Sequence, residues 1–364
     1  MKGLFYTSFA IKSSYFLPSF LDKIFTKIFS LPQQVVAMRV NFKKLIEKYV
    51  LPVSMMVGFL VFLLFENVSV LEQYRSQISN FVNPIIPACV CVMLYSAFCK
   101  VQLEKMKPRK WHFYLLITQL VLSLVLVGVI TYFKDFTYKE ALIGALVCVV
   151  GPTAASAGVV ASKLGGEEST ISGFMIVSNA MCAVTIPLLL PLVNGRGESH
   201  FFLEFLNILR MVFPIIIVPF VLAQLTKLYF KRLHHFMLTK FKDLAFYVWS
   251  ASLVLITARA CSNAYHANLT LINALALLTA AVAVCIVHFG LGRVVGSFFN
   301  EKVNAGQAFG QRNMIFCIYV ALTYTDPISS IVATLHMLVQ NFYNSYQIIE
   351  YKKLDSGEIK NLYE

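Results

Sequence analysis

The sequence predicts an all-α membrane protein with ten transmembrane helices, arranged as two inverted five-helix repeats whose fourth and ninth helices are broken. Three observations lead to this fold class. The composition is that of a chain made mostly of membrane spans, and two of these spans contain polar or helix-breaking residues. The two interrupted spans also occupy corresponding positions in a weak internal repeat.

Composition separates the chain from soluble proteins before any motif is considered. Its 364 residues are 58% hydrophobic and only 13% charged, and the mean hydropathy is +0.70. These values indicate one polytopic membrane domain in contact with the lipid bilayer. The net charge of +13 comes from basic residues in the loops between apolar runs, so we expect no nucleic-acid partner.

Apolar runs long enough to cross a hydrocarbon core of roughly 30 Å follow one another along the chain. The predicted spans are 49–65, 79–98, 112–133, 139–162, 171–193, 203–225, 244–262, 269–291, 305–324 and 327–349. The loops rich in Lys and Arg fall on one side of this arrangement, together with the segments that flank the first and last spans. The positive-inside rule therefore predicts a multi-pass protein of the plasma (inner) membrane with both termini cytoplasmic.

The predicted ninth span is interrupted by polar residues. It reads AGQAFGQRNMIFCIYVALTYTDP and contains Gly306, Gly310 and Arg312. A charge inside a span is costly and commonly marks a functional site. The glycines and amides favour a broken helix whose free backbone groups line a polar cavity. The alternative is a short helix that starts in a cytoplasmic loop, with Arg312 reaching the lipid headgroups.

The predicted fourth span, ALIGALVCVVGPTAASAGVVAS, is interrupted at Gly151 and Pro152. Proline removes a backbone donor from the helix at this point. The small residues that follow, Thr153 to Gly158, allow the backbone of another helix to approach closely. A second broken helix is therefore expected here.

An internal repeat relates the two interruptions. The tetrapeptide YVLP, ending at Pro52, opens the first span, and MVFP, ending at Pro214, opens a later one, an offset of 162 residues. The same offset carries Pro152 to a position two residues after Arg312. Because five spans are an odd number, the second repeat enters the membrane from the other side. Corresponding breaks in two inverted halves are the strongest sequence indication of a transporter's binding site.

The domain boundaries follow from these spans. Residues 1–40 are predicted to be an N-terminal extension, either an amphipathic segment on the membrane surface or a leader upstream of a true start at Met38. The predicted ten-span transporter domain covers residues 41–353. Its first repeat is 41–195 and its second repeat is 200–350. The predicted cytoplasmic tail is 354–364.

Other polar residues in the spans have simpler interpretations. The eight cysteines lie mostly in apolar runs without metal-site spacing, so we expect small packing residues and no metal, disulfide or cofactor. Amides such as Gln119 and Gln340 are expected to tie helices together. His288 and His336 either titrate and carry protons or pack as neutral, hydrogen-bonded side chains.

The interrupted segments resemble the bile acid:sodium symporter family. The resemblance is carried by GPTAASAGVVASKLGG, AFGQRNMI and HMLVQNFYNSYQI, and in organisation it extends from about Asn41 to Lys353. It implies a symporter-like secondary transporter with a ten-helix inverted-repeat fold in which the broken helices four and nine cross. Auxin-efflux-type and arsenite-type carriers share this architecture and are alternatives.

The sequence departs from the family at the sodium sites. The family's ninth helix typically reads Glu-x-Gly-x-Gln-Asn, with the acid and the amide among the sodium ligands. The residues that match this motif here are Ala308, Gly310, Arg312 and Asn313. The family's fourth-helix Ser-Asn pair aligns with Ala157 and Gly158. Sodium needs several oxygen ligands and a guanidinium only donates, so sodium is left open as a coupling ion.

Arg312 is the predicted centre of a substrate site. Its planar, permanently charged fork matches a carboxylate or sulfate and supplies the positive charge that sodium would bring. The alternative is that Arg312 bonds a structural carbonyl or carboxylate and only holds the crossing closed. The predicted substrate-binding residues are Arg312, Gln311, Asn313, Thr153, Ser156, Asn179 and Asn341. The predicted backbone breaks are Gly151, Pro152, Gly306 and Gly310.

We therefore expect a secondary transporter that moves a small or amphipathic organic anion, bile-acid-like or another carboxylate, by alternating access. No enzymatic activity is expected, because the chain lacks an intramembrane Asp pair, a His/Glu metal motif and a Gly-x-Ser-x-Gly elbow. A non-transporting membrane sensor derived from the same fold is the second hypothesis. The sequence leaves the substrate, the coupling ion, the transport direction and the oligomeric state open.

Overall fold

The computed structural model describes residues 53–68, 84–101, 108–194, 198–241, 244–267 and 269–355, and the single residues Tyr74, Gln77 and Asn80. The chain divides into two compact units, Met1–Val53 and Ser54–Glu364. The helices described below lie in the second unit, apart from the first residue of the first helix. The predicted extension 1–40, the start at Met38 and most of the tail 354–364 lie outside the described residues.

Four helices in the described part of the chain are long and apolar enough to cross a membrane. They are α6 (Lys110–Tyr132), α9 (Glu168–Val193), α10 (Glu198–Tyr229, apolar from Phe201) and α13 (Leu271–Ser297). Three shorter apolar helices are Val53–Asn67, α5 (Ile85–Lys100) and α15 (Met314–Tyr324). Two further long helices are α12 (Leu244–His266) and α16 (Ser329–Asp355). The described residues form no strand, which confirms the predicted all-α class.

The predicted fourth span contains two half-helices, α7 (Lys139–Val150) and α8 (Ser156–Ser162). The break follows from Pro152, which has no backbone donor and restricts the residue before it to extended conformations. Gly151 accordingly has ψ 151°, outside the helical region. Gly151 and Pro152 therefore lie at the break, as the sequence predicts.

The predicted ninth span also contains two half-helices, α14 (Lys302–Gly310) and α15. The break lies at Gln311 to Asn313, directly after Gly310. Gly306, expected at the break, lies inside α14, because nothing interrupts the helical hydrogen bonds before Gln311. Its role is close packing, since a Cβ on Gly306 would lie 2.8 Å from Cγ of Arg293.

The basic segment between α10 and α12 differs from the expected loop. It forms the short helix α11 (Lys231–Thr239), in which no residue is buried. Basic and apolar side chains alternate in KRLHHFMLT, so a helical segment can expose both kinds at once. Helical periodicity over nine residues is too short to distinguish such a helix from a charged loop in the sequence.

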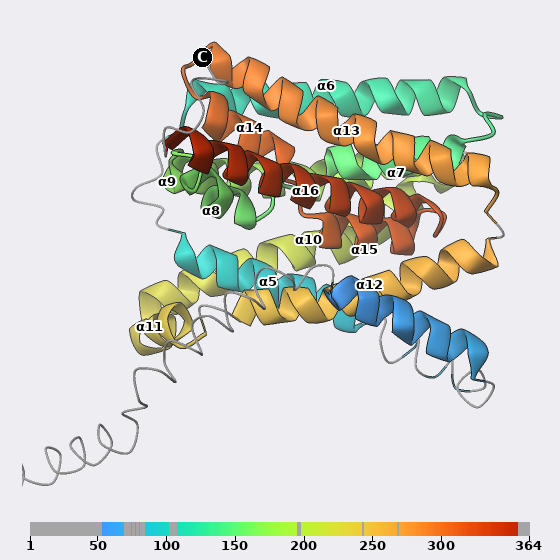
Figure 1. Cartoon of the computed structure of the whole chain (residues 1–364), viewed down its shortest axis with the longest axis horizontal. Coiled ribbons are helices and arrows are strands. Elements are labelled where there is room, and N and C mark those ends of the chain that lie inside the picture. Colours follow the sequence, from blue (N-terminus) through green and yellow to red (C-terminus); the bar gives the residue numbers. More distant parts are fainter. Residues whose placement is uncertain are drawn as a thin grey trace, which may run out of the picture. The chain divides into compact units, whose positions relative to one another are not determined.

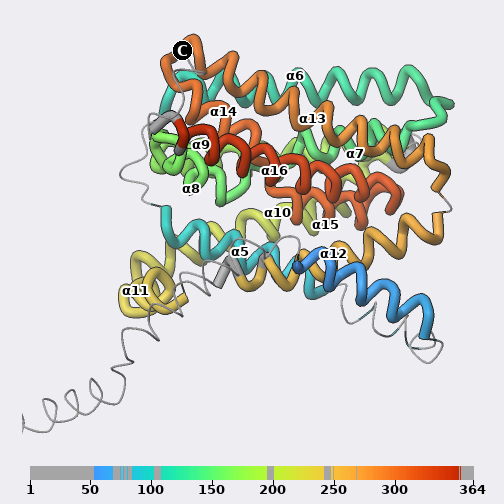
Figure 2. The backbone as a smooth tube through the Cα atoms, in the orientation of Figure 1, coloured from blue at the N-terminus to red at the C-terminus, as the bar shows by residue number. Residues whose placement is uncertain are grey.

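Longer helices pack against the half-helices (Figure 1), and α8 leaves Ser156, Val159 and Ser162 exposed. α13 packs against α14 and α16, and α16 packs in turn against α7 and α15. α8 packs against α9 and α14, whereas α10 and α12 both pack against α5. Figure 2 traces the same path and shows the connection from α14 to α15 beside α16. Both breaks therefore lie in the protein interior.

Close approach of backbones fixes the position of α14. Gly292 of α13 has no room for a side chain, because a Cβ there would lie 2.7 Å from the carbonyl oxygen of Ala305. Gly296, one helical turn later, would place a Cβ 2.7 Å from Cβ of Ala305. Small residues at this spacing permit tight helix pairing in membranes. α14 also belongs to an apolar cluster with α6, α8 and α9 that includes Trp111, Phe174 and Phe309.

Candidate functional site

The two helix breaks meet and pair through their backbones. Thr153 and Arg312 form an isolated antiparallel β-bridge. The amide of Ala154 donates to the carbonyl of Gln311 at 2.9 Å, and the amide of Asn313 donates to the carbonyl of Pro152 at 2.8 Å. These bonds satisfy backbone groups that both helices leave unpaired at their ends. The prediction that the two breaks meet in the interior is confirmed.

Each break also supplies a side chain to the carboxyl end of the opposite half-helix. Nη1 of Arg312 donates to the carbonyl of Gly151, which follows α7, at 3.0 Å. Oγ1 of Thr153 donates to the carbonyl of Ala308, near the end of α14, at 2.7 Å. The hydroxyl of Ser178 on α9 lies 3.1 Å from the amide of Thr153 and accepts its hydrogen. The carboxyl ends of α7 and α14 are thus capped reciprocally.

The amide of Gln119 on α6 completes the cap of α7. Its Nε2 lies 3.0 to 3.2 Å from the carbonyl oxygens of Val149, Val150 and Gly151. Its Oε1 accepts a hydrogen bond from Nη1 of Arg312 at 3.2 Å. Gln119 is fully buried, so its amide group needs partners within the protein. Its NH2 group faces the carboxyl end of α7, and its oxygen faces the guanidinium of Arg312.

Arg312 is held rigidly at both its backbone and its side chain. Gln340 of α16 accepts the backbone hydrogen of Arg312 at 2.9 Å and donates to its carbonyl at 3.3 Å. The guanidinium carbon lies 4.4 Å from the centroid of the Phe309 ring, a favourable cation–π position. The side chain is 1% exposed, and its Nε and Nη2 atoms have no hydrogen-bond partner among the described residues.

The other predicted substrate-binding residues have different surroundings. Ser156 donates to Oε1 of Gln311 at 3.2 Å, so both lie at the crossing. Asn313 accepts the amide hydrogen of Phe316 and caps α15. The side-chain NH2 groups of Asn179 and Asn341 donate within their own helices, to Met175 and Met337. The described contacts therefore do not bring Asn179 or Asn341 to Arg312, and their place in a substrate site stays a prediction.

The comparison with known families gives one match. The model of the Sodium Bile acid symporter family matches residues 87–267. The chain carries a sodium bile acid symporter family domain. No curated protein matches the chain. The match agrees with the resemblance that the sequence motifs carry, and it indicates a membrane transporter rather than an enzyme.

The symporter-family match contains the first break, whereas Arg312 lies beyond its end. The positions in α8 and α14 that align with the family's sodium ligands are tightly packed and carry no side-chain oxygen. Ala157 and Ala308 are fully buried in the apolar cluster of α6, α8, α9 and α14. A Cβ on Gly158 would lie 2.8 Å from Cγ of Glu168. None of these side chains carries an oxygen, and Arg312 brings a positive charge instead.

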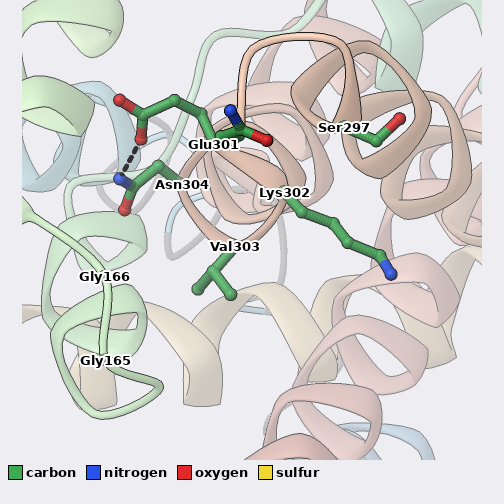
Figure 3. A pocket seen from close by; sticks show the side chains of 8 residues that line it. Gly165, Gly166, Ser297, Glu301, Lys302, Val303 and Asn304 are labelled. Atoms are coloured by element: carbon green, nitrogen blue, oxygen red, sulfur yellow. Dashed lines mark hydrogen bonds between the residues drawn. The ribbon is translucent and has the colours of Figure 1, made fainter. Parts of the chain in front are cut away.

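A second polar site lies where the α8–α9 turn meets the α13–α14 turn (Figure 3). This pocket has a volume of about 470 Å³ and is lined by Gly165, Gly166, Ser297, Asn300, Glu301, Lys302, Val303 and Asn304. Asn304 accepts the backbone hydrogen of Glu167 at 2.8 Å and donates to Glu301 at 2.6 Å. The polar groups of Asn304 therefore join the two turns, a contact that depends on tertiary packing and that no sequence pattern indicates.

Gln119 and Gln340 are functional-site residues that the sequence predicts only as ties between helices. Each was recognisable as an amide inside an apolar run, but the identity of its partner depends on which helices surround the crossing. The only local signal is that a buried amide needs hydrogen-bond partners in a membrane interior. Gln119 on α6 lies 193 residues from Arg312 in the sequence, and Gln340 on α16 lies 28 residues from it.

We predict that Gln119→Leu destabilises the folded protein by about 2–3 kcal/mol, because it removes the partner of Arg312 and leaves helix-end carbonyls unpaired. Thermal unfolding of the purified variant measures the loss. The matched control is Thr118→Val, one residue earlier on α6, whose hydroxyl bonds only within its own helix. Equal melting temperatures for the two variants would contradict the proposed cap.

Proposed function

We propose that the protein is a secondary transporter that moves a small or amphipathic organic anion across the plasma membrane by alternating access. The observation that carries the proposal is the positive charge of Arg312, which is buried where the two breaks cross. The buried Arg312 guanidinium forms no ion pair with a carboxylate in the described part of the chain, and two of its nitrogens have no partner. Burying a charge without a counter-ion is strongly unfavourable, so a bound anion is the natural complement.

The geometry of the guanidinium supports a two-oxygen anion. Nε and Nη2 form one edge of the planar group, and their hydrogens point in parallel. This edge fits the two oxygens of a carboxylate, sulfonate or sulfate. Nη1, on the other side, is occupied by Gly151 and Gln119. The two interpretations of Arg312, as a structural tie and as a substrate ligand, therefore apply to different nitrogens of one side chain.

The surrounding helix ends strengthen the same conclusion. α15 begins directly after the break and is capped by Asn313. Its amino end contributes a partial positive charge close to Arg312. The carboxyl ends of α7 and α14, which are partially negative, are already capped by Gln119, Arg312 and Thr153. The electrostatic balance at the crossing thus favours an anion over a cation.

The proposed topology has ten spans in two inverted repeats, 41–195 and 200–350, with both termini in the cytoplasm. Its support is that a helix of the described structure lies in every predicted span, with half-helices in the fourth and ninth. The reciprocal capping by Thr153 and Arg312 is what an approximate two-fold axis in the membrane plane would produce. Small movements of one repeat against the other would expose the crossing alternately to the two sides.

We predict that organic anions stabilise the purified protein against heat and that neutral analogues do not. The probes are benzoate, glutarate, taurocholate and an alkyl sulfonate, each compared with its amide or ester. Arg312→Gln and Arg312→Lys should weaken binding of the best probe at least about tenfold, because one or both charge-assisted bonds are lost. Arg293→Gln is the matched control, since Arg293 lies over the ring of Tyr343 instead.

Unchanged anion binding by a well-folded Arg312→Gln protein would contradict the proposal. Binding with no flux of the same anion in proteoliposomes would favour the membrane sensor over the transporter. Equal loss of thermal stability in both Arg312 variants, without any effect of anions on the wild type, would leave Arg312 with only its structural bonds.

We also predict that replacing sodium by potassium leaves anion stabilisation and flux unchanged within about twofold. Ala157, Gly158 and Ala308 provide no side-chain oxygen for a cation that needs several. The positive charge of Arg312 opposes sodium at the same place. Anion flux measured over a range of sodium concentrations at constant ionic strength tests this. A steep, saturable dependence on sodium would show that other oxygens form a sodium site.

A further inference from the structure

Two histidines face each other beside the crossing. His288 lies on α13 and His336 on α16, and their ring centroids are 5.9 Å apart. Both side chains are 0% exposed. The pair therefore lies between two helices that pack against each other, α13 beside α14 and α16 beside α15, and it is closed off from solvent.

None of the four ring nitrogens of His288 and His336 has a hydrogen-bond partner among the described residues. A neutral imidazole carries one donor and one acceptor, and leaving them unpaired in the interior is unfavourable. An apolar side chain of similar size would fill the same space without that loss. Burial opposes a positive charge on either ring, so a proton on the pair needs a negative group nearby, and the two adjacent imidazoles can then share that proton.

The histidine pair is linked to Arg312 through Phe309. The His288 ring lies 5.2 Å from the Phe309 ring, and the same ring also lies beside the guanidinium of Arg312. Burial and, after it, the charge of Arg312 both oppose a proton on either imidazole. The pair and the predicted anion site therefore lie within one electrostatic environment.

The neighbouring elements contribute no negative charge to the pair. The helices packed against α13 and α16 are α6, α7, α12, α14 and α15. The titratable groups that interact electrostatically with the same guanidinium are the thiols of Cys148 on α7, Cys182 on α9 and Cys317 on α15, and the thiol of Cys285 on α13 interacts with that of Cys148. In the described part of the chain, Arg312, which lies in the break between α14 and α15, is the charged side chain that interacts with both histidines.

We propose that His288 and His336 form a proton-binding site that is coupled to anion binding at Arg312. While the guanidinium is unneutralised, its charge opposes a proton on the pair. An anion on the Nε–Nη2 edge cancels that charge and places a negative group nearby, so the proton binds more readily. By reciprocity the proton strengthens anion binding to the same extent. The two ligands then move together, and the proton takes the part that sodium plays in a sodium symporter.

This coupling rests on the proposed anion site, but the response of the histidines to the Arg312 charge is measurable without any substrate. The experiment is NMR of the protein with isotope-labelled histidine, titrated from pH 5 to pH 9. The chain has seven histidines, and the single variants His288→Gln and His336→Gln assign the two relevant signals. Where either variant fails to fold, His288→Phe or His336→Phe replaces it.

The comparison is between the wild type, Arg312→Gln and the charge-conserving control Arg312→Lys. Arg312→Met is a second uncharged variant for the case that Arg312→Gln does not fold. Removing a unit charge several ångströms away should move the titration of the pair to higher pH by about one to two units, at an effective dielectric constant of about 20. Arg312→Lys should titrate as the wild type does.

The proposal is overturned if the two signals do not titrate in an uncharged Arg312 variant, or if they titrate at the same pH in all proteins. The first outcome identifies an inert packing pair, and the second identifies histidines insulated from Arg312. The outcome of the anion screen does not depend on the outcome of this titration. A shifted titration with no anion that stabilises the protein would retain the proton site and reject the proposed substrate class.

Discussion

The hydrogen bond from Nη1 of Arg312 to the carbonyl of Gly151 is the interaction on which the interior depends. It joins the break of the ninth predicted span to that of the fourth, and Gln119 and Thr153 complete the exchange by capping the same two half-helices. A broken helix can exist in a membrane only if its freed backbone groups are bonded. Arg312 bonds the first break through Nη1 alone. The guanidinium therefore stays charged, and its Nε and Nη2 hydrogens remain available as donors.

The sequence was sufficient for the parts of the fold that follow from local chemistry. Apolar run lengths predicted where the helices lie, and Pro152 predicted the first break, because proline ends a helix wherever it occurs in the middle of one. Arg312 was predicted as the centre of a site for a similar reason, since no apolar environment accepts an isolated charge at low cost. These signals do not depend on which helices are neighbours.

The partners of those residues depend on tertiary packing and could not be predicted. Gln119 reaches α7 and Arg312 from a helix nearly two hundred residues away, and a single amide in an apolar run does not reveal that. Gly306 illustrates the converse error: glycine suggested a break, but it permits close packing against Arg293 inside a continuous helix. The facing of His288 and His336 likewise exists only because α13 and α16 pack together.

The central claim is that the Nε–Nη2 edge of Arg312 holds an anion while Nη1 holds the crossing. The most direct test is an experimental structure from crystals soaked in selenate, whose selenium is located by anomalous scattering. The account predicts a selenium peak beside Nε and Nη2, with Nη1 still bonded to Gly151. A guanidinium whose Nε and Nη2 donate to protein oxygens, with no selenium peak at the crossing, would contradict it.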